Sequence, residues 1–222
     1  MFTKVLLVDD IDLNTAGAAE VVAALGIEKI VHAKYCDEAL LKIKKALFDN
    51  KPFDLLITDL SFEDDYRETT IKSGEDLLKE VKKLDSKIKL IAFSIENEPY
   101  RIKNLFDKFQ INGYVMKGRN TKEILKKTIE KVFKNEDKVI ADELLHLLND
   151  TATNEIDSYD IELLKQLSLG YPQEQMPARF KELGIEPNSK STIEKRISKL
   201  KDYFKASNPT HLIAIAKDLR LV

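Results

Sequence analysis

The stretch KVLLVDD, residues 4–10, places two aspartates directly after a run of apolar residues. A second stretch, DLLITDL at 54–60, has the same form, and its apolar run ends at Asp59. A short, uninterrupted apolar run is typical of a strand that is buried on both faces, as in a parallel sheet. These two stretches therefore predict buried strands, and they raise the question of why such strands should end in carboxylates.

Apolar runs and amphipathic segments alternate along the first part of the chain. We expect strands at 4–8, 29–33, 54–58, 88–93 and 113–116. Helical spacing of apolar residues follows in 38–48, 75–84 and 121–133. In the first two of these helices the expected buried face includes Phe48 and Leu84. Parallel strands need crossover helices, so the pattern predicts an α/β fold, a doubly wound five-stranded parallel sheet with five helices.

The rest of the chain shows only helical patterns. Apolar residues recur with helical spacing in 159–169, 175–183, 191–204 and 210–219. Four short helices in about 65 residues are typical of a small all-α helix-turn-helix module. We therefore predict a first domain at 1–134, a linker with a short helix at 135–156 and a helical domain at 157–222, with Pro177 opening its second helix.

Composition excludes several classes of protein. The chain has 222 residues and no apolar run near the roughly 18–20 residues that a membrane span needs. No signal peptide is recognisable, and the single cysteine, Cys36, fits a reducing compartment, so we expect a cytoplasmic protein without membrane partners. The three histidines are scattered and lack metal-ligand spacing. Residues 190–205 hold six basic and two acidic side chains, which favours a nucleic-acid partner.

The strand-end aspartates have a physical explanation. The carboxyl ends of parallel strands lie at one edge of the sheet, where ligands bind. Asp9, Asp10 and Asp59 would converge there, and like charges at close range repel one another unless a cation holds them. An all-oxygen cluster of this kind suits Mg²⁺. The sequence therefore predicts a magnesium site formed by these three carboxylates.

Two further strands end in side chains with complementary chemistry. LIAFS (90–94) ends in the hydroxyl of Ser94, and GYVMKG (113–118) brings the ammonium of Lys117. A carboxylate nucleophile, a cation, a hydroxyl and an ammonium at one edge favour phosphoryl transfer, which depends on neutralising the transferring oxygens. We expect Asp59 to attack phosphorus, Lys117 to stabilise its oxygens and Ser94 to donate to the bound phosphoryl group.

The stretches VLLVDD, LLITDL, IAFS and GYVMKG, in this order, resemble the receiver domain of two-component response regulators over about 1–134. The resemblance implies that Asp59 accepts a phosphoryl group from a sensor histidine kinase. It also implies that Asp9 and Asp10 bind Mg²⁺ with the backbone carbonyl of Ser61, and that Ser94 and Tyr114 form a switch pair. Such a domain catalyses only its own phosphorylation and slow dephosphorylation. The chain departs from the family in the long loop LSFEDDYRETTIKS (60–73), which contains Glu63, Asp64, Asp65, Arg67 and Glu68 and suits a lid, a kinase contact, a dimer contact or a tolerated insertion.

The helical tail resembles the LuxR/NarL-type DNA-binding domain over about 157–222. The residues that carry the resemblance are Glu162-Leu163, Gly170, Leu183-Gly184-Ile185 and Thr192-Ile193. The segment 138–148 is also similar to the one that follows the receiver in this subfamily. The stretch from Gly170 to Thr192 is longer than usual and contains three prolines. The resemblance implies a recognition helix that begins near Ser191 and enters the major groove of double-stranded DNA.

The helix near 191–204 has an outward and an inward face. We expect Ile193, Ile197 and Leu200 to face the core. The predicted DNA contacts are Lys190, Ser191, Thr192, Glu194, Lys195, Arg196 and Lys199. Lysines suit phosphates, whereas Arg196 could face either way. Glu194 stands where the family often has a basic residue, and there it would either read cytosine or repel phosphate.

Three functions fit these residues. The first is a phosphorylation-dependent transcription regulator that forms a homodimer when phosphorylated, through either its first-domain helices or its last helix. The second is a receiver whose helical domain binds a protein, which Glu194 and the lengthened turn suggest. The third is an aspartyl-phosphate phosphatase; those enzymes generally want a second acid two residues after the nucleophile, where this chain has Ser61.

Overall fold

The computed structural model describes residues 1–63, 69–97, 99–136, 138–145, 156–219 and 221–222. The chain divides into two compact units, Met1–Asn149 and Asp150–Val222, and each is described by itself. The division falls inside the predicted linker at 135–156. Within the described ranges, no helix is both long and apolar enough to cross a membrane.

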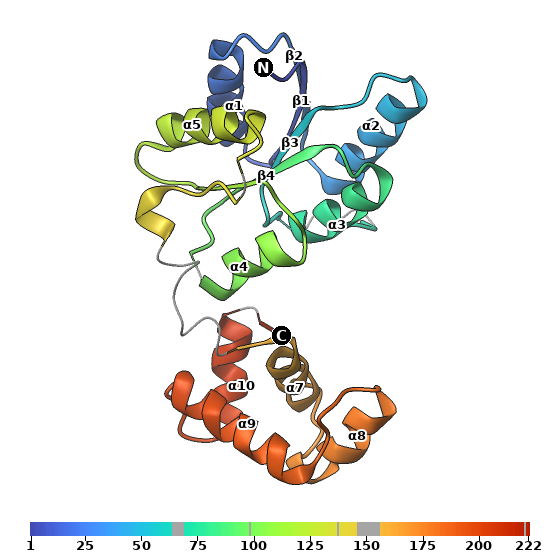
Figure 1. Cartoon of the computed structure of the whole chain (residues 1–222), viewed down its shortest axis with the longest axis vertical. Coiled ribbons are helices and arrows are strands. Elements are labelled where there is room, and N and C mark those ends of the chain that lie inside the picture. Colours follow the sequence, from blue (N-terminus) through green and yellow to red (C-terminus); the bar gives the residue numbers. More distant parts are fainter. Residues whose placement is uncertain (64–68, 98, 137, 146–155, 220) are drawn as a thin grey trace. The chain divides into compact units, whose positions relative to one another are not determined.

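The first unit is built on one parallel five-stranded sheet, which confirms the predicted fold class (Figure 1). Its strands are β1 (Lys4–Val8), β2 (Lys29–Ala33), β3 (Leu55–Thr58), β4 (Lys89–Ser94) and β5 (Gly113–Met116). They lie in the order β2-β1-β3-β4-β5, so the chain moves outward from β1 first in one direction and then in the other. Ligands of doubly wound sheets bind where this direction reverses, at the carboxyl ends of β1 and β3.

Helices cover both faces of the sheet (Figure 1). On one face lie α1 (Asp12–Ala24) and α5 (Thr121–Phe133); on the other lie α2 (Cys36–Phe48), α3 (Gly74–Leu84) and α4 (Pro99–Asp107). Alternate residues of β1 feed the two cores, with Val5 and Leu7 on the α1 side and Leu6 and Val8 on the α2 side. All four side chains are buried, because each strand residue meets a helix-covered face.

Two expected core residues lie outside the core. Phe48 is 86% exposed and Leu84 is 41% exposed, so their predicted burial was wrong. The buried stripe of α2 instead runs through small side chains such as Ala39 and Ala46 on either side of Ile43. Phe48 follows Ile43 by five residues, which at 3.6 residues per turn places it about 140° around the helix. It therefore points away from the stripe, as the last residue of its helix.

The segment after α5 returns to the sheet. Val139 forms a parallel bridge with Gly113 at the start of β5, and both Val139 and Ile140 are buried. A short 3₁₀ helix, η1 (Asp142–Leu144), follows within the predicted helical segment at 138–148. Residues 146–155 lie outside the described residues, so the rest of that prediction stays open.

The second unit consists of helices around a small apolar core. They are α7 (Ser158–Ser168), η3 (Gln173–Gln175), α8 (Met176–Glu182), α9 (Lys190–Tyr203) and α10 (Pro209–Asp218). Side chains cap three helix starts: Asp157 forms a capping box on α7, Ser189 caps α9 and Asn208 caps α10. Pro177 lies in the first turn of α8, as the sequence predicted. The buried core includes Leu163, Leu164, Phe180, Ile193, Ile197, Leu200 and Leu212.

Gly74 is required by a close approach of two backbone segments. A Cβ added at residue 74 would lie 1.9 Å from the carbonyl oxygen of Asp59 and 2.8 Å from Cα of Leu60. We predict that Gly74→Ala lowers the free energy of unfolding of this unit by about 1–3 kcal/mol or more, because backbone atoms must shift. Urea denaturation followed by circular dichroism would measure the loss. Gly118→Ala is the matched control, since a Cβ there meets no atom within 4 Å; equal midpoints for both variants would contradict the prediction.

Candidate functional site

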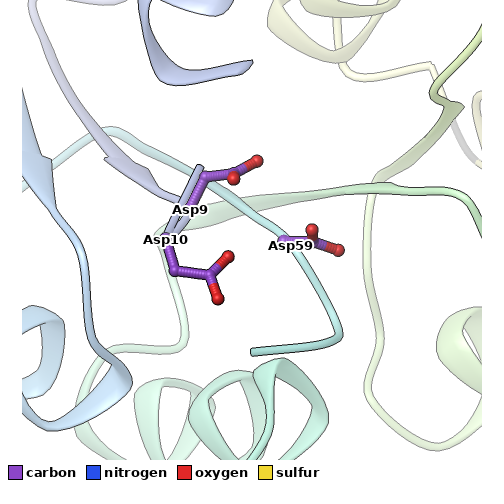
Figure 2. A group of neighbouring side chains, drawn as sticks. All are labelled: Asp9, Asp10 and Asp59. Carbon is purple, nitrogen blue, oxygen red and sulfur yellow. The ribbon is translucent and has the colours of Figure 1, made fainter. Parts of the chain in front are cut away.

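Three carboxylates meet at the carboxyl ends of β1 and β3. Asp9 and Asp10 follow β1, and Asp59 follows the neighbouring β3. One oxygen of each lies within 4.8 Å of one oxygen of the other two (Figure 2). Asp9 and Asp59 are buried, whereas Asp10 is partly exposed. The structure thus brings together the carboxylates that the sequence singled out, at the point where the sheet changes winding direction.

Lys117 reaches this cluster from the end of β5. Its Nζ donates to Oδ2 of Asp9 at 2.7 Å and forms a second ion pair with Oδ2 of Asp59. The Lys117 side chain is 11% exposed, and its Nζ lies 5.1 Å from the centre of the Phe93 ring, so little water screens the charge. One ammonium facing three carboxylates leaves two negative charges at the site, and a divalent cation would balance them.

Backbone N–H groups orient the carboxylates. Oδ1 of Asp9 accepts from Ile11 at 2.9 Å, and Oδ1 of Asp59 accepts from Leu60 at 2.6 Å. Oδ2 of Asp10 accepts from Glu63 at 2.8 Å, a contact made by the long loop. Burial raises the pKa of Asp9, although the hydrogen bond from Lys117 opposes this rise. The site therefore carries an electrostatic cost that a bound cation would relieve.

The donor set fits Mg²⁺. Hard cations prefer carboxylate and carbonyl oxygens, and Mg²⁺ is usually held by a few carboxylates together with water. Asp9, Asp10 and Asp59 would supply those oxygens. Ser61 follows closely, and its N–H faces Oδ1 of Asp59 at 3.4 Å. The assignment of its backbone carbonyl as a further ligand stays a prediction.

Ser94 and Tyr114 lie beside the cluster and differ in the hydrogen bonding of their hydroxyl groups. Thr58 of β3 pairs with Ala92 of β4, so Asp59 and Ser94 end adjacent strands within one residue of each other. Among the described residues, the buried Oγ of Ser94 has no hydrogen-bond partner. A buried hydroxyl without a partner is costly and suggests a ligand that completes it. Tyr114 is fully buried, and its hydroxyl donates to the backbone carbonyl of Glu96.

Sequence reasoning missed a second charged cluster next to the site. Arg101 of α4 pairs with the Glu96 carboxylate at 2.5 Å and with Glu75, in the first turn of α3, at 2.7 Å. The guanidinium thereby ties the loop after β4 to two helices. No periodic signal could have revealed this, because Glu75 and Arg101 are 26 residues apart and belong to different elements.

Both described ends of the long loop 60–73 are anchored. On the first side Glu63 donates to Asp10, and on the second side Thr70 N–H donates to the Asp37 carboxylate of α2 at 3.0 Å. The acidic and basic residues at 64–68, which suggested a lid or a partner contact, lie outside the described residues.

The outward face of α9 carries the expected side chains. Exposed positions are Lys190, Ser191, Glu194, Lys195 and Lys199. Ile193, Ile197 and Leu200 are buried, as their spacing predicted. Thr192 is half-buried, and its N–H donates to Oγ of Ser189 at 3.2 Å, so it contributes to the helix cap. Oε1 of Glu194 lies 3.9 Å from Nζ of Lys190, and the lysine partly offsets the negative charge of the glutamate.

Arg196, which the sequence left able to face either way, pairs with other residues of the helical unit. Its guanidinium donates to Asp160 and to Asp157, both at 3.0 Å, and lies over the ring of Tyr159 at 5.4 Å. Asp160 is fully buried, and burial raises its pKa. Arg196 therefore holds α9 against α7, and we assign it to the packing of the helical unit.

Comparison with known proteins supports the fold. No protein-family model and no curated protein sequence matches the chain. A solved structure of RcsB dimers bound to DNA matches with a TM-score of 0.63 and 21% identity, covering 97% of this chain and 98% of that one. The RcsB response regulator of Salmonella typhimurium matches with a TM-score of 0.67 and 19% identity, covering 97% and 99%.

The first unit also matches on its own. The isolated REC domain of RcsB from Salmonella enterica serovar Typhimurium, solved with the phosphomimetic BeF3⁻, gives a TM-score of 0.54 at 20% identity. It covers 66% of this chain and 98% of that one. At these identities the likeness shows the fold: both parts of the chain have counterparts in the RcsB structures.

Removal of one carboxylate tests the metal site. We predict that Asp10→Asn weakens Mg²⁺ binding about tenfold or more, because it removes one of the charges that hold the ion. Isothermal titration calorimetry would measure the dissociation constant. Asp12→Asn is the matched control, since its exposed carboxylate pairs with Lys34 at 2.7 Å outside the cluster; equal loss in both variants would argue against a site at Asp10.

Removal of Arg196 tests its structural role. We predict that Arg196→Ala lowers the free energy of unfolding of the helical unit by about 3 kcal/mol, because it removes the guanidinium that pairs with the buried Asp160 carboxylate. Lys195→Ala, on the exposed face one residue earlier, should change it by less than about 0.5 kcal/mol. Calorimetric unfolding of the full chain would measure both values. Similar small effects would show that Arg196 is not needed for packing.

Proposed function

We propose that this protein is a response regulator of a two-component system. In this proposal a sensor histidine kinase supplies a phosphoryl group to Asp59, and the modification controls binding of the helical unit to double-stranded DNA and hence transcription. The observation that carries the proposal is the cluster at the sheet edge, where Lys117 bridges Asp9 and Asp59 beside the Ser94 hydroxyl, which has no hydrogen-bond partner in the described part of the chain. A cytoplasmic location and slow self-dephosphorylation, without turnover of other substrates, belong to the same proposal.

The geometry suits phosphoryl transfer to a carboxylate. An oxygen of Asp59 attacks phosphorus, the new P–O bond forms as the P–N bond of the donor breaks, and the donor imidazole leaves with its electron pair. Lys117, already paired with Asp59, is placed to neutralise the oxygens of the transferring group. Mg²⁺, when bound by Asp9, Asp10 and Asp59, supplies further charge neutralisation.

The groups around Asp59 also suit the phosphorylated state. The Ser94 hydroxyl lacks a partner among the described residues and can donate to a phosphoryl oxygen. Burial raises the pKa of Tyr114, so its phenol stays protonated and continues to donate to the Glu96 carbonyl. The Tyr114 ring is thus buried in the same structure in which the groups around Asp59 can bind a phosphoryl group.

The helical unit suits DNA through α9. Lys190, Lys195 and Lys199 are exposed on one helix, and neutralisation of phosphates by such side chains drives salt-dependent binding. RcsB, whose structures share the fold, has been solved bound to DNA as dimers. We extend this to a homodimer of the present chain, because a two-fold protein matches two half-sites.

Binding of a protein partner remains the alternative for the helical unit. It was suggested by Glu194, whose carboxylate would repel phosphate. In the structure Lys190 faces Glu194, and the exposed lysines outnumber it on this face. We therefore favour DNA, with Glu194 able to accept from a cytosine amino group.

A salt series tests both halves of the proposal. Binding to random-sequence duplex DNA is measured by fluorescence anisotropy with Mg²⁺, with and without beryllofluoride as a phosphoryl mimic. We expect affinity to fall steeply with salt and to respond to the mimic, and we expect Asp59→Asn to abolish that response. Lys195→Ala should reduce the slope of log K against log salt by about one, because one phosphate contact is lost.

Lys29→Ala is the matched control for the lost charge, since Lys29 is exposed on β2 of the other unit. It should retain the full salt slope. A flat salt dependence with and without the mimic would refute the DNA half and favour a protein partner. Failure of beryllofluoride to bind would refute the phosphorylation half.

A further inference from the structure

The outer face of α2 exposes two large apolar side chains. Leu41 is 68% exposed and Phe48 is 86% exposed, although the opposite side of the same helix is buried. Seven residues span about 20° less than two helical turns, so the two side chains lie on one stripe, two turns apart. A single exposed apolar residue is ordinary, but this spacing is the one at which paired helices exchange apolar contacts.

Lysines flank the stripe on both sides. Lys44 and Lys45 lie between Leu41 and Phe48 along the helix, and both are exposed. Each is separated from Leu41 and from Phe48 by three or four residues, which makes it a surface neighbour of both apolar side chains. The outer face of α2 therefore places positive charge directly beside its exposed apolar groups.

The carboxylates at the two ends of α2 have other neighbours. Glu38, in the first turn, pairs with Lys42 at 2.6 Å. Asp49, which follows the helix, interacts electrostatically with Lys4 at the start of β1. These two acidic residues therefore face lysines that lie outside the stripe.

The neighbouring helix α3 extends the positive charge. It packs beside α2 (Figure 1), and its exposed side includes Lys79 and Lys83. The hydrogen bond from Lys83, together with the charges of Lys79 and Lys44, lowers the pKa of the Glu80 carboxyl. Four lysines, counting Lys45, thus surround or adjoin one carboxylate, and three positive charges are left over.

We propose that this face binds an acidic amphipathic helix of a partner protein. The basic apolar surface, as we call it, consists of Leu41, Lys44, Lys45, Phe48, Lys79 and Lys83. Apolar side chains of the partner, two turns apart, contact Leu41 and Phe48, and its carboxylates face the lysines. Because α2 begins beside the carboxyl end of β2 and runs back toward the start of β3, Phe48 lies toward the sheet edge opposite to Asp59. The proposal therefore does not rest on the proposed function.

Other occupants fit these residues less well. A second copy that docked through the same face would set like-charged lysines against each other. A helix that lies in a membrane surface buries a wide apolar face, whereas α2 exposes a single file of apolar side chains. Duplex DNA would use the lysines and leave Leu41 and Phe48 in water.

Three synthetic peptides test the basic apolar surface, with binding to the full chain measured by fluorescence anisotropy. The first is a helical peptide that carries two leucines two turns apart among glutamates. In the second peptide alanines replace the leucines, and in the third lysines replace the glutamates. We expect the first peptide to bind at least about tenfold more tightly than either of the others, because only it matches both the apolar groups and the charge.

Variants of the chain locate the binding. Phe48→Ala should weaken binding of the first peptide about tenfold, and its high exposure means that the core is left intact. Leu13→Ala is the matched control, since Leu13 is 81% exposed on α1, which covers the other face of the sheet, and this variant should bind like the wild type. Lys45→Glu should weaken binding of the first peptide and strengthen binding of the third, a reversal that a loss of folding could not produce.

Several results would overturn the proposal. Equal binding of the first and second peptides would reduce the effect to charge alone, and wild-type binding by Phe48→Ala would place it elsewhere. Absence of binding by the first peptide at millimolar concentration would also refute it. Vesicles of phosphatidylserine and phosphatidylcholine, or duplex DNA, that bind in its place and are lost in Phe48→Ala would assign the surface to a membrane or to nucleic acid. A dimer in sedimentation equilibrium that Phe48→Ala dissociates would assign it to a second copy.

Discussion

The structure depends on holding three carboxylates together at the carboxyl ends of β1 and β3. Repulsion among them is strong because Asp9 and Asp59 are buried, where water screens charge poorly. The sheet order makes β1 and β3 neighbours, and β5 delivers Lys117 to the same edge. A glycine at 74 lets the start of α3 lie against the backbone of Asp59. The strand order, Lys117 and Gly74 therefore all help to hold the three carboxylates at this edge of the sheet.

This arrangement is built for a ligand more than for stability. The raised pKa of Asp9 and the Ser94 hydroxyl, which none of the described residues pairs, are costs that the two apolar cores offset. Surrounding N–H groups nevertheless hold each carboxylate in place before any cation or phosphoryl group arrives. Such preorganisation is what phosphoryl transfer needs, because its catalysis relies on positioning and charge neutralisation.

Charge is used differently in the two units. In the first, opposite charges are gathered in mostly buried clusters, around Lys117 and around Arg101. In the second unit, Arg196 forms ion pairs with Asp157 and Asp160, while lysines of the same helix are exposed to solvent. Phosphorylation and DNA binding, as proposed, would thus act on separate sets of residues.

Local patterns in the sequence determined the strands, three of the helices of the sheet unit, the strand-end aspartates and the outward lysines of α9. Local patterns are sufficient for these features because a doubly buried strand and an amphipathic helix each produce a recognisable order of apolar and polar residues over a short stretch. Tertiary structure alone decided that Arg196 turns to Asp160, 36 residues away, that Arg101 reaches Glu75, and that Val139 joins the edge of β5. Each of these depends on which surfaces meet after the chain has folded, and no spacing within a single element records that.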